Sequence, residues 1–186
     1  MKIKLYKIAL LFLCFPLFGI AAGPGWNGKY TKEKKIKKEF NVSPKALLKL
    51  NNSYGNLHIT SWNENRTVIE VHIKTNSNSE EKAQKKLDEI DIEFQNSSSM
   101  VSAKTIFSKS GWGWSNNNVS MEINYTVKVP IGNTVDLNND YGGIYLDEIN
   151  GVANISCDYG RLELGKLNAD NNVLTFDYTS KSTVEY

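Results

Sequence analysis

The sequence LNNDYGGIYL at positions 137–146 decides the fold that we expect, because the chain repeats it. Similar segments are LNNSYGNLHI at 50–59 and ISCDYGRLEL at 155–164, and a weaker copy begins with LTFDY at 174–178. The recurring aromatic and glycine residues are Tyr54, Gly55, Tyr141, Gly142, Tyr159, Gly160 and Tyr178. The last three tyrosines are 18 and 19 residues apart, which indicates a structural repeat of about that length.

Each unit alternates apolar and polar residues, as β-strands do. The third and fifth residues after the tyrosine are apolar, as in Ile144 and Leu146 or Leu162 and Leu164. Glycine lets the chain bend after the tyrosine, and asparagine at the end of each unit tolerates a tight corner. This pattern favours a right-handed β-solenoid whose coils stack at the strand spacing of about 4.8 Å. A β-sandwich with coincidental turn spacing is the alternative.

The whole chain is therefore expected to be mainly β, with four segments. These are a signal peptide at 1–22, a basic leader and first strand at 23–46, a β-rich region at 47–130 and solenoid repeats at 131–186. One short helix is expected over about 79–90, because Ser79 can cap it and Ala83, Leu87 and Ile90 form an apolar stripe. The repeat pattern fails after Tyr178, so we expect a truncated array with an open edge that allows self-association.

The N-terminal segment has the three-part layout of a secretory signal peptide. Lys2, Lys4 and Lys7 precede an apolar run at 8–18 and the small residues at 21–23. The run is shorter than the roughly 20 residues that a membrane-spanning helix needs. We therefore expect an exported chain without a transmembrane span in its mature form, located in the periplasm, at the outer surface or outside the cell. Its one remaining cysteine, Cys157, is expected to be buried.

The charge balance limits the class of partner. The chain has 22 Lys and Arg against 20 Asp and Glu, a formal net charge of +2, which becomes −1 once the three leader lysines are removed. Such a chain is a poor candidate for binding nucleic acid, which requires many basic side chains. A lysine-rich stretch at 29–38 contains Glu33 and is followed by Glu39. It favours a solvated lead-in over a patch for anionic polymers.

Two tryptophans are the candidate binding residues. Trp112 and Trp114 lie in a segment at 108–118 that is rich in glycine, serine and asparagine. Exposed aromatic rings are suited to stacking on sugar rings or on a protein partner, such as a glycan, a matrix component or an envelope protein. The alternative is that the rings fold back and cap an edge of the core.

Catalytic and metal-binding motifs are absent from the sequence. His58 and His72 occupy outward positions of alternating strands, and there is no phosphate-binding loop, paired-cysteine motif or helical histidine pair. Asp140, Asp158 and Asp177 would stack on one another and are weak candidates for calcium ligands, although a role at the corners is favoured. We therefore expect no cofactor, no metal and no catalysis.

The repeats and their surroundings resemble a bacterial family of secreted proteins named as adhesins, a domain of unknown function with β-helix-like repeats. The likeness rests on the leader, FNV at 40–42, LNNSYGNL at 50–57, the helix near 82–90, INYTVKVP at 123–130 and the Asp-Tyr-Gly units. It implies an exposed envelope protein that adheres, and it assigns no binding residues. The alternatives are a carbohydrate-active β-helix enzyme of the envelope and a structural or assembly protein.

Overall fold

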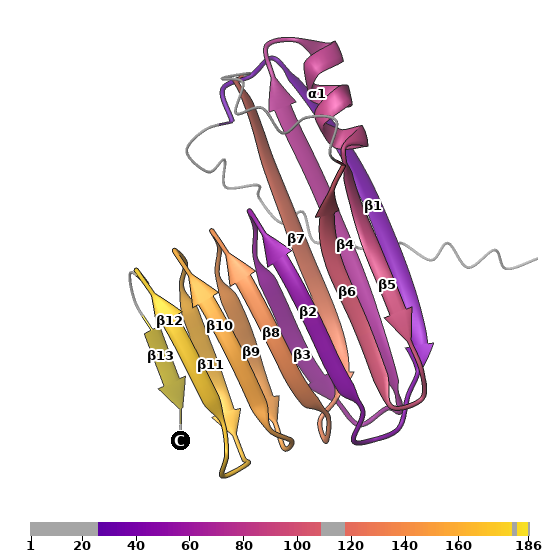
Figure 1. The fold of residues 1–186 in the computed structure, drawn as a ribbon, viewed down its shortest axis with the longest axis vertical. Coiled ribbons are helices and arrows are strands. Elements are labelled where there is room, and N and C mark those ends of the chain that lie inside the picture. Colours follow the sequence, from indigo (N-terminus) through magenta and orange to yellow (C-terminus); the bar gives the residue numbers. More distant parts are fainter. Residues whose placement is uncertain (1–25, 109–117, 180–181, 186) are drawn as a thin grey trace, which may run out of the picture.

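A computed structural model describes residues 26–108, 118–179 and 182–185. The strands in these ranges form two sheets (Figure 1). The seven-stranded sheet has, in spatial order, β1 (Tyr30–Asn41), β4 (Arg66–Ser77), β7 (Val119–Pro130), β3 (Leu57–Trp62), β9 (Ile144–Ile149), β11 (Leu162–Leu167) and β13 (Ser182–Glu185). The six-stranded sheet has β12 (Val173–Asp177), β10 (Ala153–Asp158), β8 (Thr134–Asp140), β2 (Leu47–Ser53), β6 (Met100–Phe107) and β5 (Ile90–Asn96).

The predicted fold class, a right-handed β-solenoid, is wrong. Both sheets are mixed: β4 pairs antiparallel with β1 and β7, and β5 pairs antiparallel with β6, whereas the remaining pairs are parallel. The three strands of 12 residues, β1, β4 and β7, run antiparallel to their neighbours in this group and belong to the seven-stranded sheet that β9, β11 and β13 also join. Alternating residues and glycine corners occur in solenoid coils and in two facing sheets alike, so the pattern did not separate the two architectures.

The repeats themselves pair in register. Successive strands after residue 130 go alternately to the six-stranded and the seven-stranded sheet, so each unit contributes one strand to each. Leu137 of β8 aligns with Ile155 of β10, and Ile144 of β9 aligns with Leu162 of β11. The earlier unit joins the same rows, because β2 pairs with β8 and β3 pairs with β9. The spacing of the units is therefore structural and not coincidental.

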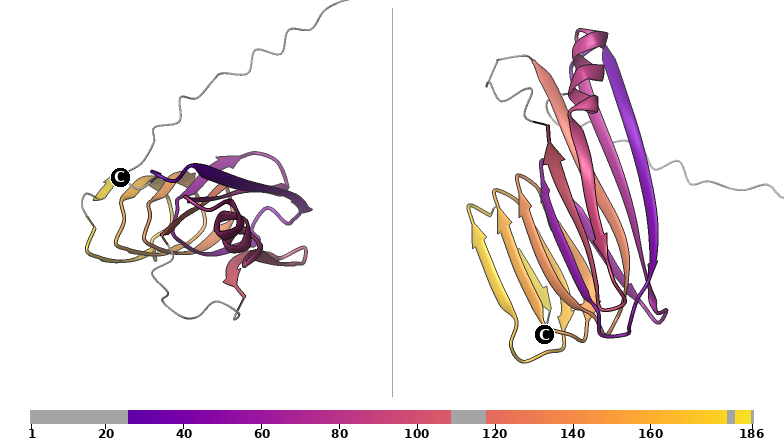
Figure 2. Two further views of the ribbon diagram at one scale, coloured as in Figure 1. Left: turned by 90° about the horizontal axis from the view of Figure 1, so that it is seen from above. Right: turned by 45° about the vertical axis from the view of Figure 1, so that its right-hand side comes forward.

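The core lies between the two sheets, which face each other in the view from above (Figure 2). Inward residues of both sheets are fully buried, including Leu48 and Leu137 from one and Leu57 and Ile144 from the other. Each such side chain contributes roughly 1.5–3 kcal/mol by leaving water. The core therefore continues from the long strands into the repeats without a break.

The helix α1 (Glu80–Asp88) packs beside β4 and β1 at one end of the molecule (Figure 1). The Ser79 hydroxyl accepts a hydrogen bond from the Lys82 N–H at 3.4 Å and so caps the first turn. Ala83 and Leu87 are buried, and the Thr75 hydroxyl donates to the Ala83 carbonyl at 2.8 Å. The helix lies within the range expected from the sequence.

The lysine-rich stretch is most of β1, at the outer edge of the seven-stranded sheet. Lys32 pairs with Glu80 at 2.6 Å, and Lys37 pairs with Glu70 at 2.8 Å. These ion pairs support the reading of the stretch as a solvated structural segment. The predicted signal peptide lies outside the described residues. Within the described ranges, no helix is long and apolar enough to cross a membrane.

Candidate binding surfaces

The predicted binding residues, Trp112 and Trp114, lie outside the described residues, so their placement stays untested. The repeat tyrosines are described, and they form a ladder on the surface. The rings of Tyr54, Tyr141, Tyr159 and Tyr178 follow one another with centroid distances of 5.3, 5.1 and 5.0 Å and interplanar angles of 6°, 9° and 3°. Their exposed fraction rises from 37% for Tyr54 to 80% for Tyr178. This tyrosine ladder is a continuous aromatic surface in contact with solvent.

The ladder depends on an unusual backbone conformation. All four tyrosines have φ between 51° and 64°, which non-glycine residues adopt rarely and at a cost of about 1–3 kcal/mol. Stacking of neighbouring rings, worth about 0.5–1.5 kcal/mol per pair, partly offsets this cost. The sequence pattern located the corner correctly, but it assigned the tight turn to the following glycine.

The glycines serve a different purpose, which is close backbone contact between units. A Cβ at Gly142 would lie 1.9 Å from the Gly55 carbonyl oxygen, and a Cβ at Gly160 would lie 2.0 Å from the Gly142 oxygen. No side chain can occupy that space without moving the main chain. The main chain of each corner is therefore in direct contact with the main chain of the corner before it. We call Gly142 and Gly160 the seated glycines.

Buried polar side chains fix the corners from inside. The Asn52 amide donates to the Asn139 side-chain oxygen at 3.1 Å, and the Asn139 amide donates to the Gly55 carbonyl at 2.9 Å. The Thr105 hydroxyl donates to the Asn52 side-chain oxygen at 2.8 Å, so the Tyr125 hydroxyl, also 2.8 Å from it, acts as the donor to Thr105. Burial raises the pKa of Tyr125, which keeps this hydroxyl protonated. These contacts satisfy the buried groups and hold the corner backbone in place.

Cys157 occupies the position of the two asparagines in the next unit. Its thiol is buried and donates to the Gly142 carbonyl at 3.4 Å. Burial raises the pKa of the thiol, and the nearby carboxylates of Asp158 and Asp140 raise it further. The predicted burial of this cysteine is confirmed, and the thiol is kept in its unreactive, protonated form.

The three aspartates expected to stack do align. Asp140 pairs in register with Asp158, which pairs in register with Asp177. Their main-chain carbonyls accept hydrogen bonds from the Tyr54, Tyr141 and Tyr159 N–H groups at 2.9–3.0 Å. The hydrogen bonds at the corners are therefore made by the main-chain carbonyls of these aspartates. Among the described residues, no three His, Cys, Asp or Glu side chains are grouped in a way that could hold a metal ion.

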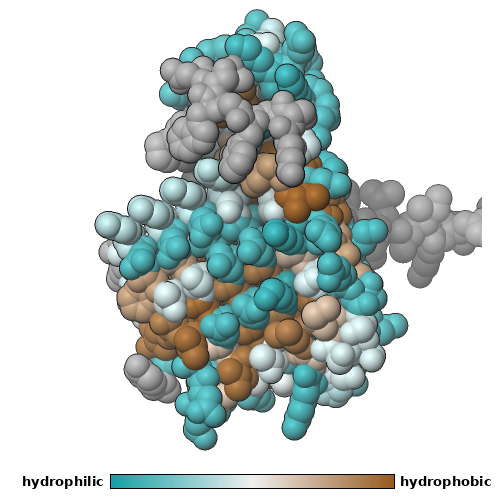
Figure 3. Space-filling view, in the orientation of Figure 1, coloured by the Kyte–Doolittle hydropathy of each residue, from teal (hydrophilic) through white to brown (hydrophobic). Residues whose placement is uncertain are grey.

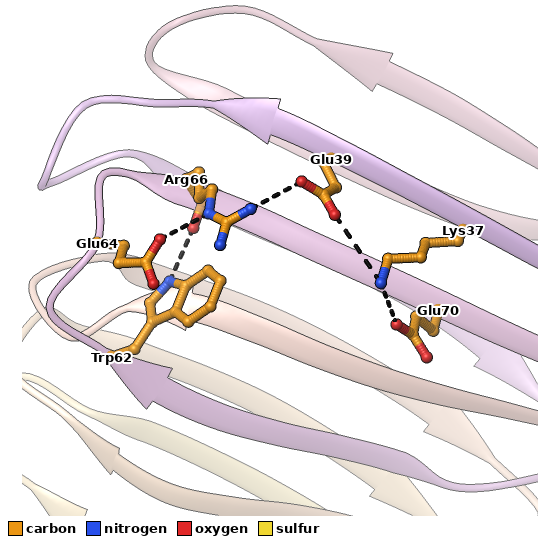
Figure 4. Close-up of polar contacts among 6 residues, drawn as sticks. All are labelled: Lys37, Glu39, Trp62, Glu64, Arg66 and Glu70. Atoms are coloured by element: carbon orange, nitrogen blue, oxygen red, sulfur yellow. Dashed lines mark hydrogen bonds and ion pairs between the residues drawn. The ribbon is translucent and has the colours of Figure 1, made fainter. Parts of the chain in front are cut away.

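The ring of Trp62 lies on the outer face of the seven-stranded sheet, where two cationic side chains cover it. The Arg66 guanidinium lies 4.8 Å from the centre of the Trp62 ring, and the Lys128 ammonium lies 5.4 Å from it. The ring nitrogen of Trp62 donates to the Arg66 carbonyl at 2.8 Å (Figure 4). Arg66 is in turn held by Glu64 at 2.7 Å and Glu39 at 2.8 Å. This ring is therefore occupied by the protein's own side chains.

A groove of about 570 Å³ lies on the same outer face, over β3, β9, β11 and β13. His58 and Tyr145 stack in it, with ring centroids 4.3 Å apart and an interplanar angle of 11°. Register places Glu163 on the other side of Tyr145. Asp147 and Gly165 also line the groove.

Sequence reasoning missed this groove, although the repeats contain its signal. The fourth residue after each tyrosine is His58, Tyr145 or Glu163, and all three point outward from neighbouring strands. The outward positions of the repeats, aligned on their tyrosines, place these side chains in one row. Gly165, which also lines the groove, lies at a register shift between β11 and β13, and a lone glycine within a strand is the sequence signal of such an irregularity.

The chain matches no protein-family model and no curated protein. Solved structures are similar to it. A "putative cell adhesion protein" from Clostridium sporogenes shares 19% identity with a TM-score of 0.51, over 79% of this chain and 68% of that one. "Putative adhesins" from Bacteroides fragilis and Parabacteroides merdae share 14% and 11% identity with TM-scores of 0.30 and 0.37, over 77% and 81% of this chain and 61% and 56% of theirs. At these values only the first likeness shows a shared fold, and it shows the fold alone.

Proposed function

We propose that the protein is a non-catalytic binding scaffold of the adhesin type, which acts in the cell envelope or at the cell surface. The observation that carries the proposal is the exposed tyrosine ladder. Aromatic side chains are enriched where proteins contact partners, because each ring buries a large area and its hydroxyl can still hydrogen-bond. The likeness to the Clostridium sporogenes protein, whose name refers to cell adhesion, is consistent with this role.

The ladder is suited to binding because it is already rigid. The asparagine contacts and the seated glycines fix the corners, and each ring is held by its neighbours. A surface that is ordered before binding loses little conformational entropy when a partner arrives. The outer face of the six-stranded sheet adjoins the ladder and presents rows of hydrophilic side chains with hydrophobic surface between them (Figure 3). A glycan, a matrix component or another envelope protein would meet this combined surface.

Export is the second part of the proposal, and it rests on the predicted signal peptide at 1–22. The absence of catalysis is the third part. In the groove, the carboxylates of Asp147 and Glu163 are engaged by backbone N–H groups and by Arg161, respectively. Acids held in this way orient main chain and side chains, which is a structural use. We propose no enzymatic function for the groove on that ground.

The proposal is tested by screening the exported chain against immobilised glycans, matrix proteins and isolated envelope. Tyr141→Asn with Tyr159→Asn removes two rings but retains a residue that accepts a positive φ. We expect the double variant to bind its partner at least about tenfold more weakly, with a nearly unchanged thermal melt. Tyr141→Phe with Tyr159→Phe is the matched control for the rings. No binding in the whole screen, or release of cleaved glycan, would contradict the proposal.

A role in assembly is the second candidate, and one observation favours it. Phe176 of β12 is 48% exposed, although Cys157, at the same position in the neighbouring strand, is completely buried. An apolar side chain next to a strand edge favours pairing with another chain. Light scattering over a range of concentrations tests this candidate, since a chain that stays monomeric at high concentration contradicts it.

A further inference from the structure

We propose that the groove on the outer face of the seven-stranded sheet binds an uncharged saccharide. Its volume of about 570 Å³ falls within the range of about 300–1,000 Å³ that small-molecule sites occupy. The proposal does not depend on the tyrosine ladder, which lies at the corners between the sheets. Either surface could bind while the other does not.

One wall of the groove is an aromatic ring held in a fixed orientation. Tyr145 stacks on His58 through one face, at 4.3 Å between centroids. Its other side is turned toward β11, where Glu163 aligns with it. Tyr145 is half-buried, so the ring is anchored yet still reaches the groove. The part of this rigid ring that lines the groove can make apolar contacts with the C–H groups of a sugar.

The remaining lining consists mainly of hydrogen-bond acceptors. Asp147 accepts from the Glu148 N–H at 2.6 Å and from the Ser61 N–H, which lies 2.9 Å from Oδ1 and 3.2 Å from Oδ2. A carboxylate has about four acceptor positions, so Oδ2 keeps capacity for a ligand hydroxyl. Glu163 and Glu185 add further carboxylates, and Thr60 and Thr183 add hydroxyls. Sugar hydroxyls are donors to such groups, and hydrogen bonds to ionised acceptors are the stronger ones.

Gly165 lines the groove beside Asp147, where the main chains of β11 and β9 are in close contact. A Cβ there would lie 1.8 Å from the Asp147 carbonyl oxygen, and the pairing of β11 with β13 shifts register at this point. The chain therefore keeps Asp147 and Gly165 in direct main-chain contact along the groove. The Ser61 and Glu148 N–H groups, which donate to the Asp147 carboxylate, hold that carboxylate at the groove.

The charge of the lining selects against acidic ligands. The described lining residues include three carboxylates and neither lysine nor arginine. Sialylated or sulfated sugars would be repelled. Two of the carboxylates already have donors, Asp147 from the backbone and Glu163 from Arg161 at 2.5 Å. The groove is therefore better suited to donating hydroxyls than to a ligand held by charge alone.

The test uses NMR titration of the exported chain with neutral, sialylated and sulfated oligosaccharides and with a lysine-rich peptide. We expect a neutral oligosaccharide to shift the Tyr145 and His58 ring signals, with an affinity that changes little between low and high salt. Tyr145→Ala should weaken binding about tenfold, whereas Tyr145→Phe retains it. Tyr30→Ala, at the far edge of the same sheet, is the matched control. The unmodified chain gives the ring shifts even if Tyr145→Ala fails to fold.

Several outcomes would overturn the proposal. One is the absence of any ring shift with every neutral sugar, and another is binding that Tyr145→Ala leaves intact. Exclusive binding of the lysine-rich peptide, lost at high salt, would identify the groove as a site for cations instead. Glycan binding that only the tyrosine-ladder variants weaken would reject the groove and leave the adhesin proposal standing.

Discussion

The long-stranded N-terminal part and the repeats after residue 130 use different means to hold the same two sheets. In the N-terminal part, β1, β4 and β7 form antiparallel ladders whose outer face carries ion pairs such as those of Arg66 and Lys37 (Figure 4). In the repeats, parallel strands are joined by corners that depend on stacked rings and seated glycines. Surface ion pairs tolerate substitution, whereas a seated backbone does not.

Because of this difference, the aromatic rings of the two parts differ in how far they are available for binding. In the N-terminal part, Trp62 is covered by Arg66 and Lys128 and contributes to stability. In the repeats, the tyrosine rings cover one another and leave their remaining surface to solvent. The candidate binding surfaces therefore gather on the repeats and on the strands next to them.

The largest expected effect is at a seated glycine. Gly142→Ala places a Cβ 1.9 Å from the Gly55 carbonyl oxygen, and the main chain must move to relieve the clash. We expect a loss of about 3 kcal/mol or more in the free energy of unfolding, measured by urea denaturation. Gly143→Ala is the matched control, since its Cβ would lie 2.8 Å from the Tyr145 side chain and 3.1 Å from the nearest main-chain atom, the Arg161 carbonyl oxygen. Equal losses in both variants would show that the corners are not seated as described.

An intermediate effect is expected at the buried asparagines. Asn139→Ala removes the buried donor to the Gly55 carbonyl, which costs about 1–3 kcal/mol, while the Asn52 amide keeps its hydrogen bond to the Ile123 carbonyl. Cys157→Ala, at the same position in the next strand, removes only one weak hydrogen bond and a small volume. The expected loss in unfolding free energy is therefore larger at Asn139 than at Cys157. The reverse order would mean that packing, and not hydrogen bonding, holds the corners.

The repeat could be read from the sequence because its signal is local. The spacing of Tyr141 and Tyr159 and the alternation after them identify the strands, and the two rings do stack. The sheet arrangement was not predictable in the same way. Whether β4 returns antiparallel beside β1 depends on contacts far apart in the sequence, such as Ile36 with Val71. Local periodicity carries no information on these pairings.

The candidate sites likewise differ in whether their signal is local in the sequence or depends on strand pairing. The prediction of Trp112 and Trp114 as binding residues rests on two rings in a glycine-rich segment, and both residues lie outside the described residues. The groove consists of His58, Tyr145 and Glu163, each ordinary in its own strand. Their significance appears only when parallel pairing brings them into one row. The outward positions of the repeats therefore carry information on the groove, as the inward positions carry information on the core.

The smallest expected effect is at an ion pair of the N-terminal part, between His72 and Glu33. The His72 ring N–H donates to the Glu33 carboxylate at 2.7 Å, and this hydrogen bond holds the pKa of Glu33 below its ordinary value despite partial burial. A carboxyl whose pKa is lower in the folded state stabilises the fold above its unfolded pKa of about 4.3. This contribution is lost as the pH falls through the lowered folded pKa. Urea denaturation at pH 6 and pH 3 should therefore show a smaller acid-induced loss of stability in Glu33→Gln than in the natural chain.

The expected effect at His72 and Glu33 is much smaller than the effect expected at the glycines of the repeats. Both side chains are partly exposed, so solvent limits the contribution to about 0–1 kcal/mol. His72→Gln should reduce the acid-induced loss by a similar amount, and the double variant should add nothing further, since either change alone breaks the contact. Identical pH dependence in the natural chain and in Glu33→Gln would contradict the assignment. A loss of unfolding free energy as large as that in Gly142→Ala would contradict the conclusion that the ion pairs tolerate substitution and the corners do not.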